Sequence, residues 1–190
     1  MASEDGWMAF VDGENFTIQA QEVASENGLN LVEGEYFKRD CFIWLPTIPG
    51  RGPIVKGDLL GYNPAVRASY YTSVHGSVDL VKEVRESLWR LGFDGHVFKK
   101  TRKEEKSKGV DIALSKDMLS HAFMGNFSIA VLVAGDGDYV PLVEEVKRLG
   151  KQVFVGFFSK GLNDELRLAS DQFSDMTEPL ITSWRAAPEN

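Results

Sequence analysis

Cysteine is nearly absent from this sequence, and histidine is sparse. Cys41 is the single cysteine among 190 residues, so neither an internal disulfide nor a cysteine-rich zinc site can be built. The histidines His75, His96 and His121 are scattered, and no pair has the spacing of metal ligands. These absences argue against disulfide-stapled folds and zinc-centred hydrolases, and they fit a reducing compartment.

Long hydrophobic runs are also missing. No run approaches the roughly 18 apolar residues of a spanning helix, and the start, MASEDGWMAF, lacks a basic region followed by an apolar stretch. We therefore expect a cytoplasmic protein without a membrane partner. The hydrophobic content of 43% suffices for one buried core. We predict a single domain over residues 1–190, with its core at about 7–176.

The charge balance is acidic, with a net charge of -7, which is unusual for a protein that binds nucleic acid. The distribution is uneven, however. The segment KKTRKEEKSK at residues 99–108 carries six basic residues against two acidic ones. Such a run is either a solvated loop or a lip that contacts phosphates.

Short apolar runs alternate with helical patterns, as in βαβ units with a mostly parallel sheet. We predict five strands at residues 7–11, 68–74, 95–99, 128–134 and 152–158. Helices are expected within residues 15–28, 78–92, 110–123 and 141–150, with a last one at about 162–173. Residues 29–66 are rich in Gly and Pro and predict an excursion at the rim of the active face, although EYFKRDCFIWLP could form a strand or hairpin arm.

Aspartates follow several of the predicted strands. Asp12 comes directly after the first strand, Asp136 and Asp138 follow the fourth, and Asp111 heads the third helix. Because ligands of open parallel sheets bind outside the carboxyl ends of the strands, these acids should converge if strands one and four are neighbours. Each also has a structural explanation, as a turn residue, a helix cap or a charge near a helix N-terminus.

Crowded carboxylates repel one another, and a divalent cation relieves that repulsion. Mg²⁺ or Mn²⁺ prefers hard oxygen ligands and retains several waters, so a few carboxylates and a substrate phosphate complete a site. Such an ion activates a water for attack on phosphorus, and two ions about 3.5 to 4 Å apart can also stabilise the leaving oxygen. The four aspartates are therefore candidate metal ligands and catalytic residues.

Other polar residues are candidates for orienting or binding a substrate. Asn15 lies three residues beyond Asp12, where its amide could orient an acid or a phosphate or cap the helix. Asp117 is a weaker candidate, because six residues place it well around the helix from Asp111. Basic candidates for contact with phosphate are Lys99, Lys100, Arg102, Lys103 and Lys108.

Four stretches of the sequence, in order, resemble the motifs of the NYN domain family, which belongs to the PIN-like nucleases. They are AFVDGENF, KSKGVDIALSKDML, IAVLVAGDGDYVPLVEEVKRLGKQVFV and LNDELRLASDQFSDM. The resemblance implies a Rossmann-like three-layer α/β/α fold with strand order 3-2-1-4-5. It also implies an acidic pocket that binds Mg²⁺ or Mn²⁺ and cleaves RNA, with Asp12, Asn15, Asp111, Asp136 and Asp138 at the motif positions. The segment 29–66 departs from the family pattern.

Competing interpretations differ in how well they fit. A dinucleotide-binding turn at GDGDY lacks the third glycine or alanine, which is Val140 here. A Toprim-type site would require glutamate where Asp12 stands and leaves Asp111 without a role. A non-catalytic module that binds RNA or a protein on a nuclease-like fold stays open. The sequence also leaves open the oligomeric state, a homo-oligomer included, and the choice between RNA and DNA.

Overall fold

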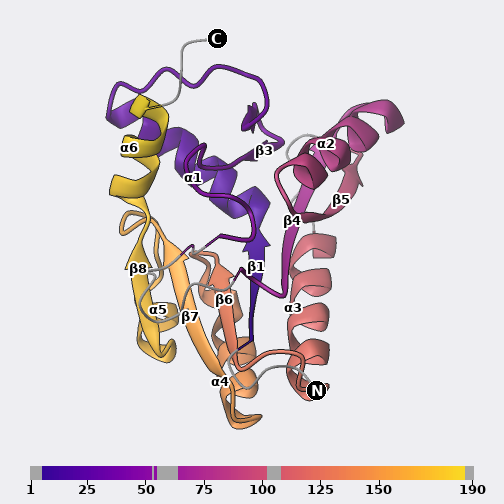
Figure 1. The fold of residues 1–190 in the computed structure, drawn as a ribbon, viewed down its shortest axis with the longest axis vertical. Coiled ribbons are helices and arrows are strands. Elements are labelled where there is room, and N and C mark those ends of the chain that lie inside the picture. Colours follow the sequence, from indigo (N-terminus) through magenta and orange to yellow (C-terminus); the bar gives the residue numbers. More distant parts are fainter. Residues whose placement is uncertain (1–5, 53, 55–63, 102–107, 187–190) are drawn as a thin grey trace.

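A computed structural model describes residues 6–52, 54, 64–101 and 108–186. Its centre is a parallel sheet of six strands in the order β5-β4-β1-β6-β7-β8, with β1 in the middle (Figure 1). The strands are β1 (Trp7–Asp12), β4 (Arg67–His75), β5 (Asp94–Lys100), β6 (Ile129–Val133), β7 (Gln152–Phe157) and β8 (Gln172–Asp175). Of the strands in this sheet, the first five along the chain (β1, β4, β5, β6 and β7) confirm the expected order 3-2-1-4-5.

Helices cover both faces of the sheet, so the fold is the predicted three-layer α/β/α arrangement. They are α1 (Gly13–Glu26), α2 (Val78–Arg90), α3 (Lys108–Phe123), α4 (Val140–Arg148), α5 (Asp164–Ala169) and α6 (Thr177–Ala186). Buried side chains of α1, α2 and α6 belong to one hydrophobic cluster, and those of α3, α4 and α5 to another. Alternating residues of β1 supply both clusters, since successive strand residues face opposite sides of a sheet.

The sixth strand corrects the sequence prediction of one helix at about 162–173. Helix α5 ends at Ala169, and residues 172–175 pair in parallel with β7. Asp171 begins this pairing, because its backbone N–H donates to Val153 O at 2.8 Å and its carboxylate accepts from Val153 N at 2.7 Å. The open edge of β7 thus gains hydrogen-bond partners that a longer helix would not supply.

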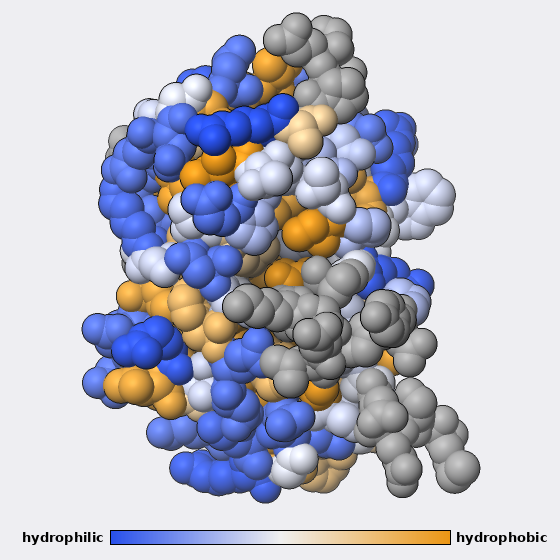
Figure 2. Space-filling model, turned by 60° about the vertical axis from the view of Figure 1, so that its left-hand side comes forward, coloured by the Kyte–Doolittle hydropathy of each residue, from blue (hydrophilic) through white to orange (hydrophobic). Residues whose placement is uncertain are grey.

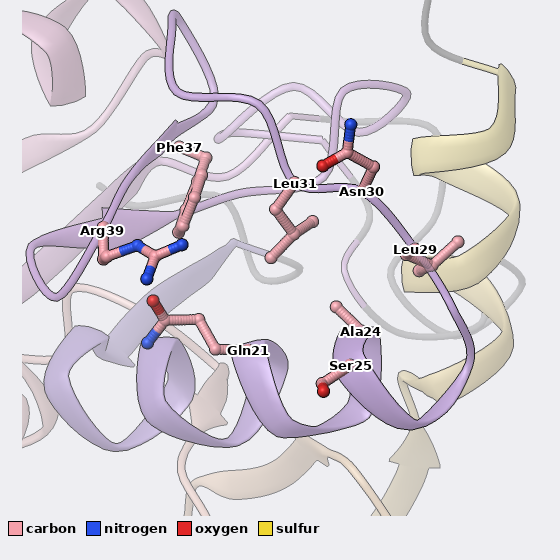
Figure 3. Close-up of a pocket in the computed structure, with 8 residues that line it drawn as sticks. All are labelled: Gln21, Ala24, Ser25, Leu29, Asn30, Leu31, Phe37 and Arg39. Carbon is pink, nitrogen blue, oxygen red and sulfur yellow. The ribbon is translucent and has the colours of Figure 1, made fainter.

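The described part of segment 29–66 adds to the core. It contains a two-stranded hairpin, β2 (Phe37–Lys38) and β3 (Phe42–Ile43), and α1 packs against it. Trp44 is fully buried, with its ring centroid 4.7 Å from that of Phe93. Between α1 and residues 29–39 lies a pocket of about 340 Å³, where Gln21 and Arg39 point toward one another (Figure 3).

Polar side chains dominate the outer face on the side of α6 and β8. Figure 2 shows hydrophilic residues over much of that face, with hydrophobic ones gathered in smaller areas between them. Within the described residues, no helix has the length and apolar character needed to cross a bilayer.

Candidate functional site

The candidate site lies at the carboxyl ends of β1 and β6. Asp12 ends β1 and caps α1, since its Oδ1 accepts from the backbone N–H of Asn15 at 3.1 Å. Pairing of β1 with β6 runs to Val11 opposite Val133, which places the turn at 135–138 beside Asp12. Strands one and four of the sequence prediction are therefore neighbours, as the convergence of the acids requires.

Tyr139 joins two of the predicted acids. Its hydroxyl lies 2.9 Å from Oδ2 of Asp12 and 3.3 Å from Oδ1 of Asp111, so its one hydrogen is shared between these two carboxylates. The side chain is buried, with 3% of the residue exposed. Sequence reasoning missed this residue, although it directly follows the acidic turn GDGD. Asp12 and Asp111 thus meet at one hydroxyl, although one comes from β1 and the other from the first turn of α3.

The electrostatics of the acids reflect burial and crowding. Burial raises the pKa of Asp12 to about 6, while the bonds from Asn15 and Tyr139 lower it and the charges of Asp111 and Glu14 raise it. Partial burial also raises the pKa of Asp111. The bond from Tyr139 lowers that pKa, and the negative charges of Asp136, Glu14 and Asp138 raise it. Asp12 and Asp111 therefore lie close enough to each other and to the neighbouring acids for their charges to interact.

The turn after β6 holds Asp136 and Asp138 through close backbone packing. Asp136 caps the short 3₁₀ helix η2 (Gly137–Tyr139), and its Oδ1 accepts from the N–H of Asp138 at 3.2 Å. A Cβ on Gly135 would lie 2.2 Å from Cε1 of Phe157. A Cβ on Gly137 would lie 2.7 Å from Nδ2 of Asn163, so a larger residue at either position would force its neighbours to shift. Asp136 therefore has the structural role that the turn interpretation predicted, in addition to its place among the acids.

Asn15 links the start of α1, just after β1, to the turn that follows β6. Its Oδ1 accepts from the backbone N–H of Gly135 at 2.9 Å, which ties the start of α1 to the acidic turn. The cap of α1 is Asp12, so the alternative role of Asn15 as a helix cap is wrong. Its position supports an orienting role for the amide.

Glu14 and Lys100 form a second polar group beside Asp12 that sequence reasoning only half identified. Lys100 pairs with Oε1 of Glu14, and the hydroxyl of Ser73 donates to Oε2 at 2.5 Å. The ion pair is largely enclosed, with side-chain exposures of 12% for Lys100 and 22% for Glu14. Glu14 gave no sequence signal, because an acid in the first turn of a helix is ordinary. The ammonium group of Lys100 is thus fixed near the acids by its ion pair with Glu14, and Lys100 is not a free residue of a basic loop.

The remaining predicted residues lie apart from this group. Asp117 accepts from the hydroxyl of Tyr71 at 3.1 Å and lies 3.4 Å from Nζ of Lys116, which places it in a different hydrogen-bond group on α3. Lys99 is exposed near the end of β5. Arg102 and Lys103 lie outside the described residues, as does the side chain of Lys108.

Comparison with known proteins decides the family. The model of the NYN domain matches residues 7–177, which is most of the chain. The chain belongs to the NYN domain family. No curated protein matches this NYN domain. A solved structure of a protein of unknown function from Vibrio parahaemolyticus superposes with a TM-score of 0.65 at 17% identity, and the match covers 95% of this chain and 98% of that one.

The likeness to the Vibrio protein shows the fold alone. A structure of a putative oxidoreductase from Parabacteroides merdae aligns with 92% of this chain and 32% of its own length, at 10% identity and a TM-score of 0.34, and it carries no argument. The family places the chain among proteins with a nuclease-like, PIN-like fold.

The donor atoms of the acid group fit a hard divalent cation. Among the described residues, no three Asp, Glu, His or Cys side chains are arranged to hold a metal ion as they stand. Asp12 and Asp111 nevertheless bring carboxylate oxygens within 2.9 and 3.3 Å of the same hydroxyl, that of Tyr139, so the two acids lie close together. Carboxylate oxygens are the ligand type that Mg²⁺ prefers, and Mg²⁺ commonly uses only one or two of them, together with waters and substrate phosphate.

Proposed function

We propose that this NYN domain is a Mg²⁺- or Mn²⁺-dependent ribonuclease that hydrolyses phosphodiester bonds with an ion-activated water. The observation that supports it best is the meeting of Asp12 and Asp111 at the hydroxyl of Tyr139. Asp12 is buried, and the pKa values of both Asp12 and Asp111 are raised; carboxylates with raised pKa values that lie close together are typical of functional sites.

In this proposal each side chain has a defined task. Asp12 and Asp111 would hold the cation, and Asp136 and Asp138 would add ligands or negative charge. The bound cation supplies charge neutralisation and a water of lowered pKa. Asn15 keeps the turn at 135–138 aligned with β1, and Lys100, held near the acids by Glu14, offers positive charge to a bound phosphate.

A cleavage assay tests the proposal. Purified protein with labelled single-stranded RNA should give products in Mn²⁺ and none in chelator. Asp12→Asn and Asp136→Asn should reduce the rate by about 100-fold or more, as expected when a metal-activated water and charge stabilisation are lost. The control Asp79→Asn, an exposed acid on α2, should cleave like the wild type. Metal-independent products, or full activity in both site variants, would contradict the proposal.

A non-catalytic RNA- or protein-binding module is the alternative, and one observation favours it. The described side chains include no ready three-ligand cage for a metal. If wild type and Asp12→Asn retain intact RNA equally well in Mn²⁺ and in chelator, the binding role is correct. The same assay with single-stranded DNA shows whether RNA is preferred.

A further inference from the structure

A groove of about 790 Å³ lies at the opposite end of the sheet from the acids. It opens where β4 and β5 begin and where α2 ends. Met8 of β1 pairs with Arg67 and Asp12 pairs with Tyr71, so the start of β4 lies four residues, or about 13 Å, back along the sheet from the acids. Its lining includes Arg51, Arg67, Arg85, Trp89, Asp94 and His96.

The groove is basic, whereas the chain as a whole is acidic. Three arginines line it against one acid, Asp94, which Arg67 already contacts at 3.3 Å. Carbonyl oxygens of Ala65 and Val66 fix the guanidinium of Arg51 at 2.6 to 3.1 Å. Arg85 is exposed, and within the described part of the chain it has no acidic partner. An anionic ligand would thus meet one prepositioned guanidinium and one unpaired guanidinium.

Trp89 gives the groove an aromatic surface. The residue is 77% exposed, which is unusual for a large apolar side chain next to a cavity. Trp89 follows Arg85 by four residues, and both lie in α2, so they project from the same face of the helix. A base can stack on the indole ring, and a phosphate can pair with the guanidinium beside it. Proteins that bind single-stranded nucleic acid combine these two kinds of contact.

The groove and the acid site lie at the two ends of one edge strand. β5 is the outermost strand, beginning at Asp94 in the groove and ending at Lys100 near the acids. Seven residues of parallel strand span about 20 Å, which is the length of about six stacked nucleotides. A bound strand following β5 would therefore reach both sites at once.

We propose that this groove binds the single-stranded flank of an RNA whose scissile phosphate lies at the acid site, with one base stacked on Trp89 and phosphates at Arg85 and Arg51. This inference rests on the proposed function for its choice of RNA. An acidic peptide could satisfy the arginines, but the exposed indole beside them favours a ligand that carries both flat rings and regularly spaced charges.

Binding of labelled single-stranded RNA of 4 and 12 nucleotides tests the groove. The full-length protein is used in chelator, and gels verify that the RNA stays intact. Trp89→Ala should weaken binding of both RNAs by roughly 5- to 150-fold, the usual loss for one stacked base, and the wild type should bind the 12-mer more tightly than the 4-mer because only the 12-mer reaches both ends of β5. Trp89→Phe, which keeps a ring, should restore most of the affinity. Because Trp89 is exposed, truncation should leave thermal melting close to that of the wild type.

Arg85→Gln should reduce the slope of log affinity against log salt by about 0.7 for the 12-mer, as expected for one lost phosphate contact on a single strand. The matched control is Arg90→Gln, which removes the same charge from the same helix outside the groove lining and should leave the slope unchanged. Equal 12-mer affinity and salt slope in wild type, Trp89→Ala and Arg85→Gln would overturn the groove assignment, even if cleavage is observed.

Failure of the groove and failure of the ribonuclease proposal are distinguishable, because binding is measured without turnover. Length-dependent binding that Trp89→Ala weakens supports the groove even in a protein that does not cut RNA. A labelled poly-glutamate peptide is the competing probe. Peptide binding that is lost in Trp89→Ala, with RNA binding unaffected, would assign the groove to an acidic protein partner instead.

Discussion

At the scale of single residues, the phenol of Tyr139 controls the charge state of its neighbours. Burial and the two adjacent carboxylates raise its own pKa, so the hydroxyl keeps its proton at neutral pH and remains a donor. A hydrogen bond to the ionised form of Asp12 lowers the pKa of that acid. The tyrosine thus opposes the effect of burial on Asp12.

Replacing Tyr139 with phenylalanine should raise the pKa of Asp12 above its value of about 6, because the carboxylate loses a donor while remaining buried. Carboxyl ¹³C chemical shifts measured against pH in the metal-free protein would report the change. Tyr71→Phe is the control, since that hydroxyl bonds Asp117 instead. A lower or unchanged Asp12 pKa in Tyr139→Phe would show that the bond does not stabilise the carboxylate.

At the scale of elements, the acidic turn depends on glycine. Gly135→Ala should destabilise the protein by about 1 to 3 kcal/mol, because the new methyl group would lie 2.2 Å from the Phe157 ring and 2.9 Å from the carbonyl oxygen of Gly161. Urea denaturation measures this loss. Gly34→Ala is the matched control, since nothing lies within 4 Å of its added Cβ, and it should change stability by less than about 0.5 kcal/mol. Equal stability of the two variants would show that the turn can move to accommodate the methyl group without a loss of stability.

The strands that carry the acids could be predicted because they are short apolar runs bounded by polar turns. β6 is buried along almost its whole length, and only two residues separate its end from Asp136. β8 could not be predicted, because the apolar spacing of Leu166, Ala169 and Phe173 also fits one helical face. Residues 172–175 form a strand because they pair with the edge of β7, and this pairing is not visible in the apolar spacing.

The contacts inside the site were less predictable than its location. The contacts of Tyr139 with Asp12 and Asp111 depend on how α3 packs over β1, and periodicity does not specify that packing. The same is true of Lys100, whose run of basic neighbours predicted a solvated or phosphate-binding loop. Its position at the end of β5 instead directs it to Glu14.

At the scale of the whole molecule, Asp12 couples folding to pH. Its pKa is 3.8 ordinarily and about 6 in the folded protein. Below pH about 4 both the folded and the unfolded chain hold the proton. Between pH 4 and 6 the unfolded chain releases it first, so the free energy of unfolding falls with rising pH, by on the order of 3 kcal/mol from this group.

Asp12→Asn should remove this fall. Urea denaturation of the metal-free protein from pH 4 to 8 should show wild type losing stability relative to the variant across that window. An asparagine at position 12 can still accept from Asn15 N, so the cap of α1 is retained. Parallel stability curves for the two proteins would mean that Asp12 titrates in the folded state as it does in the unfolded chain.

Helix α6 lies almost entirely beyond the stretch that the family shares, which ends at residue 177. Its Ser183 is fully buried and accepts from the N–H of Thr47 at 2.9 Å, and its Trp184 ring packs edge-on to Phe37. These contacts join α6 to the hairpin and to the segment that follows it. A recombinant fragment trimmed at residue 177 would lose them and expose part of the hairpin to water, so its poor solubility would say nothing about the activity proposed for the site.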